Sequence, residues 1–303
     1  MSKMRIEETF QVQLPAKVRV INIRGAIRIE AWDGDTIQVT AEMDESSGRA
    51  DRTTMRVEQA SDGMVEAVTE YENVFWGIDQ PARVEYTVKV PRQTSVRAKN
   101  VSGALHVRGV EGRHKLANVS GAVTLDDIHG DTSAKTVSGS LKARNLHGPA
   151  DLNSVSGSVE VLTSEMPTLT AASVSGSVTI ETPLYAGPYQ FSTVSGKVRL
   201  EVPDGQGLHV TGRTVSGRLK TSLPGTRGVH DRRYWDVDLN GGGPLVTMKS
   251  TSGNLVIVTD CDADAREVQF ERAAPAERAD RMDILTKVQA GELSVEEAVQ
   301  KLG

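Results

Sequence analysis

The tripeptide Val-Ser-Gly occurs seven times in the middle of the chain, and the spacing between copies is nearly constant. Successive serines are separated by 18, 18, 18, 19, 20 and 21 residues, and a related Thr-Ser-Gly follows the last copy by 36 residues. A fixed period of this length is typical of repeat proteins whose units stack along one axis. The repeated serines are Ser102, Ser120, Ser138, Ser156, Ser175, Ser195, Ser216 and Ser252.

The residues after each serine have the pattern of a β-strand. The third and fifth positions are mostly aliphatic, while the second, fourth and sixth are mostly small or charged. This period of two indicates a half-buried strand, and no helical stripe competes with it. Such a strand buries too little surface alone, so we expect an all-β parallel β-solenoid, in which rungs of about 18–21 residues stack on one another. The expected inward pairs are Leu105/Val107, Val123/Leu125, Leu141/Ala143, Val159/Val161, Val178/Ile180, Val198/Leu200, Leu219/Thr221 and Leu255/Ile257.

The strand before each serine allows two interpretations. A small polar residue stands two positions before the serine, next to the repeated valine. If this polar column faces inward, its side chains form a buried ladder that hydrogen-bonds between rungs, as stacked asparagines do. A β-bulge would instead turn the valine inward and the polar column outward. The polar column is Asn100, Asn118, Thr136, Ser154, Ser173, Thr193, Thr214 and Ser250.

Composition argues against several functional classes. A net charge of −5 leaves no basic footprint for nucleic acid. The single cysteine, Cys261, excludes a disulfide framework and a cysteine metal cluster. The first residues lack the apolar core of a secretory signal, and no run of 18 apolar residues is present. We therefore expect a cytoplasmic location, with a peripheral position at the inner face of the membrane as a variant.

The chain reads as four regions. Residues 1–93 are rich in strand patterns without the repeat, and we expect them to be an irregular part of the β-body that caps its first rung. Residues 94–265 hold the regular rungs. Residues 266–275 read as a linker, and residues 276–303 have the apolar spacing of a short helical hairpin.

Two details refine this division. The segment between Gly217 and Thr251 contains a strand pattern at Tyr234–Leu239 without a Val-Ser-Gly corner, and we interpret it as a degenerate rung. In the tail, Ser294 and Glu297 have the spacing of a capping box for a second helix.

Several motifs together resemble a known family. They are Ile-Asn-Ile-Arg-Gly at 21–25, Trp-Asp-Gly-Asp at 32–35, Val84–Pro91, the Val-Ser-Gly series and Gly-Gly-Gly-Pro at 241–244. Over residues 5–260 the chain resembles the bacterial DUF4097 group of adhesin-like β-strand repeat proteins, and its tail is similar to a SHOCT-like helical module. The resemblance implies a β-helix-like fold and a non-catalytic role near the cell envelope.

The repeated serines invite a comparison with catalytic nucleophiles. A hydrolase needs one serine beside a histidine and an orienting acid, and the same serine in eight rungs does not fit that requirement. We expect these serines to bond the local backbone in turns. We accordingly expect a non-enzymatic protein with no catalytic residue and no cofactor.

Two places in the sequence carry residue types that bind metal ions. Glu111, His129 and His147 occupy the same turn position in adjacent rungs, which brings two imidazoles and a carboxylate near one another. Surface turns often carry such residues without a ligand, and the next rung does not continue the column. The turns lack the repeated Asp of calcium-binding β-rolls, and the acidic run 260–264 lacks the glycine and final Glu of an EF-hand. We expect no metal.

The outer columns favour a contact surface over a sugar-binding groove. Opposite charges alternate along them, as in Arg108, Asp126 and Arg144, and aromatic residues make up only 4% of the chain. The candidate partner contacts are therefore an aromatic pair outside the rungs and the apolar residues of the tail. These residues are Phe75, Trp76, Ile284, Leu285, Val288, Leu293, Val295 and Leu302.

These observations favour a non-catalytic scaffold that works through contacts with a protein partner or with copies of itself, with the C-terminal helices as a docking element. Peripheral contact with a membrane is compatible with this role, and nucleic acid is not expected. The first alternative is a filament that forms end to end through the strand edges of the solenoid. A glycan-binding or glycan-active β-helix is the remote alternative, because no cluster of carboxylates is visible.

Overall fold

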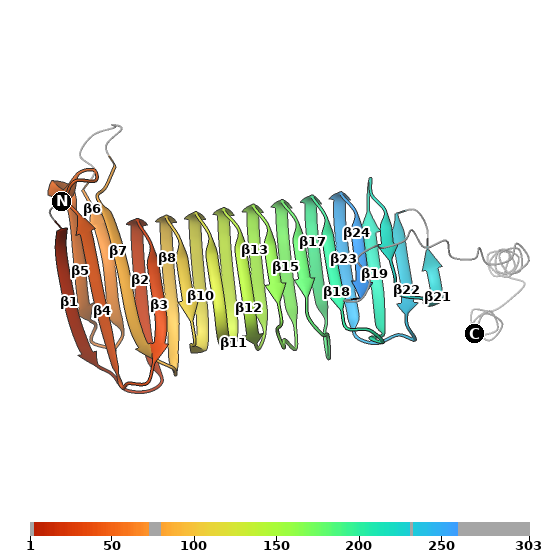
Figure 1. The fold of residues 1–303 in the computed structure, drawn as a ribbon, viewed down its shortest axis with the longest axis horizontal. Helices are drawn as coiled ribbons and strands as arrows, with labels where there is room; N and C mark the ends of the chain where they lie inside the picture. Colours follow the sequence, from red (N-terminus) through yellow and green to blue (C-terminus); the bar gives the residue numbers. More distant parts are fainter. Residues whose placement is uncertain (1–2, 73–79, 231–232, 260–303) are drawn as a thin grey trace, which may run out of the picture. The chain divides into compact units, whose positions relative to one another are not determined.

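The computed structural model describes residues 3–72, 80–230 and 233–259. The chain divides into two compact units, Met1–Glu267 and Val268–Gly303, and the described residues all belong to the first. In this unit the strands stack side by side (Figure 1) and form one hydrogen-bonded sheet of 24 strands. The sheet is folded into two rows of strands, which we call the first and the second sheet. The predicted linker and helical hairpin lie outside the described residues.

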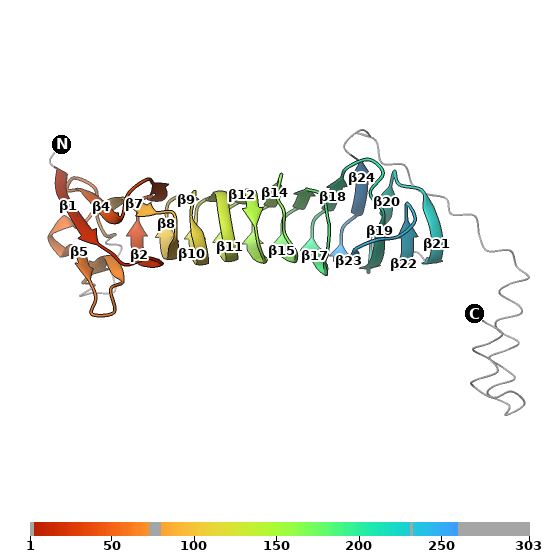
Figure 2. The ribbon, with the colours of Figure 1, turned by 90° about the horizontal axis from the view of Figure 1, so that it is seen from below.

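The first sheet consists mainly of the strands that lead into each Val-Ser-Gly corner. Its neighbouring strands appear in Figure 2 as the lower row. In spatial order they are β5 (Thr53–Gln59), β6 (Val65–Tyr71), β2 (Ala16–Arg24), β8 (Thr94–Ser102), β10 (Glu111–Ser120), the second half of β11 (Val123–Ser138), β13 (Ala150–Ser156), β15 (Leu169–Ser175), β17 (Tyr189–Ser195), β23 (Leu245–Ser252), β19 (Leu208–Thr214), β22 (Tyr234–Leu239) and β21 (Gly225–His230).

The second sheet consists mainly of the strands that leave each corner, and it forms the upper row in Figure 2. Strand β11 turns through a corner and belongs to both sheets. In spatial order the second sheet contains β1 (Lys3–Gln11), β4 (Thr36–Asp44), β7 (Arg83–Pro91), β3 (Ile27–Trp32), β9 (Leu105–Arg108), the first half of β11, β12 (Leu141–His147), β14 (Val159–Leu162), β16 (Val178–Glu181), β18 (Val198–Val202), β24 (Leu255–Thr259) and β20 (Leu219–Thr221). A short 3-10 helix, η1 (Ala50–Arg52), precedes β5.

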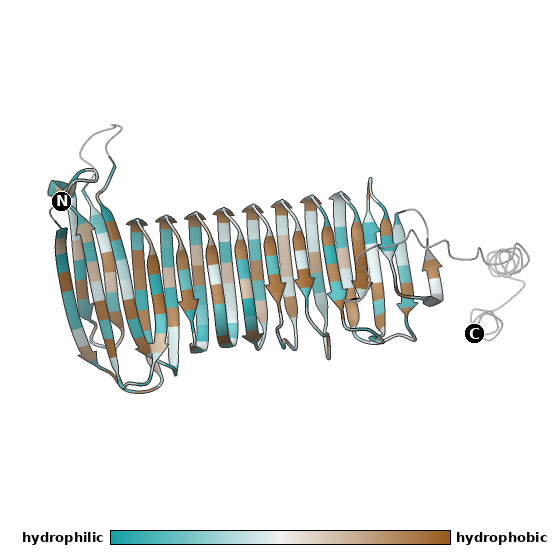
Figure 3. Ribbon diagram, viewed as in Figure 1, coloured by the Kyte–Doolittle hydropathy of each residue, from teal (hydrophilic) through white to brown (hydrophobic). Residues whose placement is uncertain are grey.

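The rungs stack in register, which confirms a mostly parallel, solenoid-like β-fold. Ser120 of β10 pairs with Ser102 of β8 and with Ser138 of β11. The predicted inward pairs from Leu105 to Leu200, together with Leu255 and Ile257, are at most 1% exposed. Figure 3 shows their effect as brown bands that cross successive strands. Stacking at the spacing of parallel strands therefore joins the apolar columns into one continuous core.

The beginning of the chain contains a rung of its own. Strands β2 and β3 pair in register with β8 and β9, and Asn22 lies beside Asn100. Beyond them, β6 and β7 continue the two sheets, and β5, β4 and β1 end them in antiparallel pairs. The irregular sequence of residues 1–93 thus combines one rung in register with antiparallel strands at the end of the stack.

The end of the stack corrects the predicted degenerate rung. Strands β23 and β24 do not follow β19 and β20 in space; they lie between β17–β18 and β19–β20. The segment between Gly217 and Thr251 supplies the hairpin β21–β22, and β22 pairs antiparallel with the free edge of β19. The hairpin turns the chain back, so that β23 and β24 form a rung inside the stack. The gap of two repeat lengths in the sequence therefore corresponds to this hairpin and not to a degenerate rung.

The glycine of each corner is required by the closeness of the rungs. A Cβ on Gly121 would collide with the carbonyl oxygen of Gly103, and one on Gly139 would collide with that of Gly121. Gly103 and Gly121 also have φ angles of 135° and 129°, which favour glycine. Gly139 does not adopt such a φ, so the stacking contact alone demands the missing side chain there.

Candidate interaction surfaces

The polar column faces inward. Asn22, Asn100 and Asn118 are at most 2% exposed, and the remaining members of the column are also buried. Each asparagine amide donates to a carbonyl oxygen of the neighbouring rung: Asn22 to Val84 at 2.8 Å, Asn100 to Gly25 at 3.1 Å and Asn118 to Gly103 at 3.0 Å. We call this column the polar ladder. It settles the alternative that the sequence left open.

The ladder continues with hydroxyl groups in the later rungs. The side chains of Ser154, Ser173 and Thr193 donate to the corner glycine carbonyls of the preceding rungs at 3.2, 2.8 and 3.0 Å. The serines of the Val-Ser-Gly corners are exposed instead, and in the described part of the chain their hydroxyls form no hydrogen bond. The corner serines were predicted to bond the local backbone, but the residue two positions before each of them, which points inward, makes these bonds instead.

The inward polar ladder forces the repeated valines outward. Successive residues of a strand point to opposite faces, so a buried residue at one position exposes the next. Seven valines form a column along the last outward position of the first sheet, and each is 46–58% exposed. We call this column the valine ladder. Its members are Val101, Val119, Val137, Val155, Val174, Val194 and Val215.

The valine ladder is an apolar stripe on a surface of otherwise mixed polarity. Ile23 and Thr251 occupy the same register position in their rungs, so the stripe spans the regular stack with one interruption. Scattered exposed apolar residues are ordinary, but contiguous patches mark contact sites in many proteins. The repeated valine is visible in the sequence. Whether it faces the core or the solvent depends on the orientation of the polar column, which the sequence leaves open.

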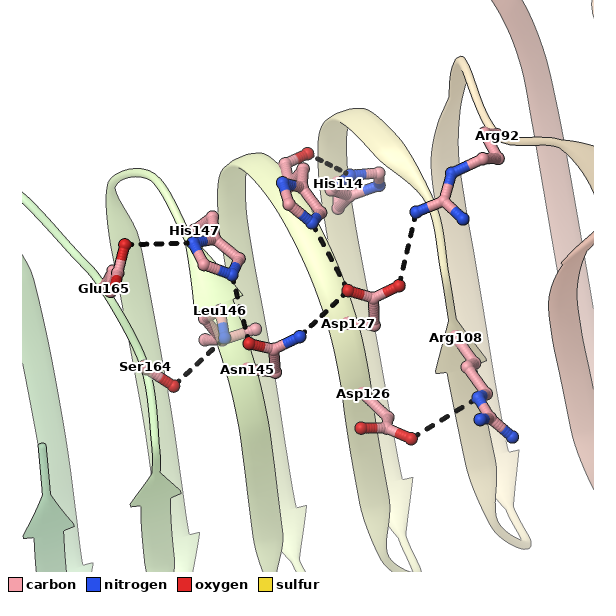
Figure 4. A network of polar contacts seen from close by, with 11 residues as sticks. Arg92, Arg108, His114, Asp126, Asp127, Asn145, Leu146, His147, Ser164 and Glu165 are labelled. Carbon is pink, nitrogen blue, oxygen red and sulfur yellow. Dashed lines mark hydrogen bonds and ion pairs between the residues drawn. The ribbon is translucent and has the colours of Figure 1, made fainter.

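A second polar network lies at the opposite corner, where β11 and β12 turn back (Figure 4). The Asn145 amide donates to Asp127 Oδ1 at 2.9 Å, and Asp127 also contacts His129 Nε2 at 3.3 Å and Arg92 at 3.4 Å. Asp127 and Asn145 adopt left-handed φ angles of 55° and 54°, which these two residue types tolerate. The corner thus gathers charged and polar side chains from adjacent rungs.

The two histidines of this corner stack rather than converge. The ring centroids of His129 and His147 are 4.4 Å apart, with an interplanar angle of 16°. His147 Nε2 donates to Asn145 Oδ1 at 3.1 Å, because that oxygen can only accept. In stacked rings the nitrogens lie side by side and do not point at a common position. Among the described residues, no group of three or more His, Cys, Asp or Glu side chains is placed to hold a metal ion. The geometry does not form the column of Glu111, His129 and His147 into a metal site.

A third histidine is buried in the core beside this corner. His114 occupies an inward position of β10 and is 1% exposed. Its Nε2 lies 3.2 Å from the carbonyl oxygen of His129, while its Nδ1 is buried without a hydrogen-bond partner. Burial lowers the pKa of His114, and the His129 carbonyl and Asp131 oppose that shift only in part. The neutral imidazole is therefore the form that the fold favours.

A shallow hollow lies on the outer face of the second sheet near β1. It contains Glu42 and Glu85, which stand opposite each other on β4 and β7. Both carboxylates are ion-paired: Glu42 with Lys3 at 3.5 Å, and Glu85 with Arg83 at 2.7 Å. These exposed pairs balance the charge of the two carboxylates.

The partner contacts predicted from the sequence lie outside the described residues. These are Phe75, Trp76, Ile284, Leu285, Val288, Leu293, Val295 and Leu302. Within the described ranges, no helix has the length and apolar character needed to cross a membrane.

Comparison with protein families gives one match. The family model described as Toastrack DUF4097 matches residues 19–258, which is most of the chain. No curated protein matches the chain. The match begins within β2 and ends within β24, so it includes the regular rungs between them.

The chain is also similar to solved structures, at low sequence identity. A "putative adhesin" from Bacteroides fragilis is 12% identical, with a TM-score of 0.50, and the match covers 85% of this chain and 98% of that one. A "putative lipid binding protein" from Parabacteroides distasonis is 13% identical, with a TM-score of 0.49, and the match covers 84% of this chain and 96% of that one. At 12% identity the likeness to the Bacteroides fragilis structure concerns the fold alone.

Proposed function

Because the chain belongs to the Toastrack DUF4097 family, we propose that it is a non-catalytic scaffold whose stacked sheets present a contact surface to other molecules. The valine ladder carries this proposal. Seven half-exposed valines in one column expose apolar surface to water, which is unfavourable in free energy. A partner surface that covers them would remove this apolar area from water and so stabilise the complex. We place this role in a bacterial cell at the envelope, as the family resemblance implies, with the protein on the cytoplasmic side.

The partner that fits the ladder is a protein with an apolar ridge or a second copy of the chain. The ladder is a single column of side chains, and exposed serines accompany it along the corner. Interfaces of this kind combine an apolar centre with a polar rim. The C-terminal residues 276–303 remain a second proposed docking element, since their apolar spacing is that of two amphipathic helices.

Affinity capture from native lysate tests the proposal with three versions of the protein. The first is the full chain, the second carries Val119→Thr, Val137→Thr and Val155→Thr, and the third ends at Arg272. Threonine keeps the β-branched shape and already occupies this column as Thr251. Loss of the same captured protein, or of self-association in sedimentation, from the threonine variant assigns the contact to the valine ladder.

A matched control removes exposed apolar groups elsewhere. Leu14 and Tyr185 are 53% and 68% exposed and lie outside the ladder, so Leu14→Ser with Tyr185→Ser should leave capture unchanged. Identical captures from the full chain and the threonine variant would refute a role for the ladder. A partner lost only from the truncated chain would move the docking function to the C-terminal residues.

A filament is the second candidate, and the two ends of the stack favour it. Within the described residues β1 pairs with β4 alone and β21 pairs with β22 alone, so each has an edge whose backbone groups are free. Free edges can pair with another copy end to end. The exposed charges of β1, which are Lys3, Arg5, Glu7 and Glu8, oppose such pairing. Electron micrographs that show only discrete particles at high protein concentration would exclude filaments.

A further inference from the structure

The outer face of the first sheet holds a group of positive charges without partners. Lys17, Arg97, Lys99 and Lys115 are exposed on β2, β8 and β10, and none of them forms an ion pair within the described residues. We call these four residues the cationic block. The body of the chain as a whole is balanced, since residues 1–259 hold 29 basic and 29 acidic side chains with the block included. The block is therefore a local accumulation of charge.

Other cations near the block have carboxylate partners, which the four residues of the block lack among the described residues. On the same face Arg19 pairs with Glu66 at 3.0 Å, and Arg113 lies 3.5 Å from Asp131. Lys135, one rung further along, lies 3.9 Å from Asp151. The acidic residues Glu66, Asp131 and Asp151 are thus paired at the margins of this face, and they leave the four cations of the block without an ion pair in the described part of the chain.

The strand register places like charges directly opposite one another. Arg97 of β8 lies between Arg19 of β2 and Lys115 of β10 in the pairing. Three cations in a row across adjacent strands repel one another, and this destabilises a sheet. Elsewhere the same protein alternates sign between rungs, as in Arg108 beside Asp126 at 3.5 Å. An anionic ligand would remove the repulsion at the block.

Aliphatic side chains accompany the cations on the same strands. Ile23, Val101 and Val119 form the beginning of the exposed column at the corner, and Lys99 stands two residues before Val101 on the same face. Ile21 of β2 is paired with Lys99 and is half-buried. The corner therefore presents an apolar edge that is flanked on one side by the cationic block.

We propose that this corner binds the surface of an anionic lipid bilayer, with the cationic block on lipid phosphates and the aliphatic edge at the boundary of the acyl region. Clusters of Lys and Arg bind anionic lipid headgroups, and adjacent apolar groups add affinity by entering the interface. A soluble polyanion would satisfy the cations and leave the aliphatic edge in water. The pairing of both features on one corner favours the bilayer.

This inference rests on the proposed contact function and names the partner for the N-terminal part of the same corner. Each cation near an anionic surface increases binding about fivefold, so the double variant Lys99→Gln, Lys115→Gln should bind about 25-fold more weakly. The full-length protein is mixed with phosphatidylcholine vesicles that contain one quarter phosphatidylglycerol and then sedimented. We expect co-sedimentation with these vesicles, little with pure phosphatidylcholine, and weaker binding at high salt.

The control variant Lys89→Gln, Arg144→Gln removes the same charge from the exposed outer face of the second sheet, and it should bind like the unmodified protein. Val101→Thr with Val119→Thr tests the aliphatic edge and should also weaken binding. Circular dichroism checks that each variant is folded.

Three results would overturn the proposal: no binding to the anionic vesicles, equal loss in the control variant, or unchanged binding of the valine variant. The last result would show recognition of charge alone, as a soluble polyanion requires. None of these results affects the capture experiment with Val119, Val137 and Val155, so a failure of the bilayer inference remains distinguishable from a failure of the scaffold proposal.

Discussion

The side-chain amide of Asn118 donates to the carbonyl oxygen of Gly103 in the neighbouring rung at 3.0 Å. The same amide also donates to the carbonyl of Gly121, at 2.9 Å, in its own corner. One buried side chain thus satisfies two corner carbonyls that the strands themselves leave unpaired. The relationship explains why a polar residue lies inside the corner and why its neighbour Val119 lies outside.

Replacement of Asn118 by alanine should destabilise the protein by about 1–3 kcal/mol, because two part-buried carbonyls lose their donor. Chemical denaturation, followed by circular dichroism, measures the change in the unfolding midpoint. Asn153→Ala is the matched control, since Asn153 points outward from β13 and donates to Asp151 at 2.7 Å on the surface. That variant should remain within about 0.5 kcal/mol of the parent. Equal effects of both substitutions would argue against the structural role of the polar ladder.

A methyl group on a corner glycine should disrupt rung stacking. Gly139→Ala places its Cβ against the carbonyl of Gly121, so the two rungs must separate or twist. We expect a lower thermal unfolding midpoint, with a cost of at least about 1–3 kcal/mol for the imposed strain.

Gly205 supplies the comparison for this substitution. A Cβ there meets nothing within 4 Å, although its φ of 78° disfavours alanine. Gly205→Ala therefore reports the cost of backbone conformation, and Gly139→Ala reports the cost of the collision. If Gly139→Ala has the smaller effect, close stacking is not the reason for the repeated glycine.

The sequence predicted the regular rungs well because the fold repeats the same local rule. Alternation of apolar and polar residues after each serine identifies the inward pairs, and a constant period identifies the stack. The orientation of the preceding strand was harder, because Asn118 and Val119 are adjacent and either could face the core. Only the contact between the buried amide and the next rung decides between them.

The order of the rungs could not be predicted from the period. Strand β23 lies between β17 and β19, although it follows both in the sequence. A gap of 36 residues between Ser216 and Ser252 reads equally well as a weak rung or as an excursion. The antiparallel pairing of β22 with β19 selects the excursion, and that pairing depends on long-range contacts that a local pattern does not encode.

His114 should make stability depend on pH near neutrality. Burial lowers the pKa of His114 in the folded protein below its unfolded value of about 6.5. The unfolded chain therefore binds a proton first as the pH falls. The stability that the neutral buried histidine permits is complete above pH 6.5 and is lost as the pH falls from there through the folded pKa.

The variant His114→Val isolates this effect. Valine suits this position, because Val96 is buried at the equivalent inward position of the neighbouring rung. Urea unfolding at pH 7.5 and at pH 5.5 should show a larger loss of stability in the parent than in the variant. A parallel loss in both proteins would assign the pH dependence to other groups. His106, whose pKa is also lowered chiefly by burial, is present in both and cancels in the comparison.

Trp235 should hold the hairpin that covers the last rung. It lies opposite Gly212 in the pairing of β22 with β19, is 4% exposed, and its ring fills the space that a Cβ on Gly212 would need. Trp235→Ala should cost about 3–5 kcal/mol locally and release β22 from β19. The freed edge of β19 would then pair with other copies, because an uncovered strand edge is a template for association.

Sedimentation velocity at increasing protein concentration measures this release as growing assemblies in the Trp235→Ala variant. Tyr234→Ala is the matched control, because Tyr234 is the adjacent aromatic residue on β22 and is 45% exposed. It should sediment like the parent protein. If Trp235→Ala stays monodisperse while its hairpin becomes sensitive to protease, the hairpin is a stabilising cover alone, and the end of the stack does not need it to prevent end-to-end association.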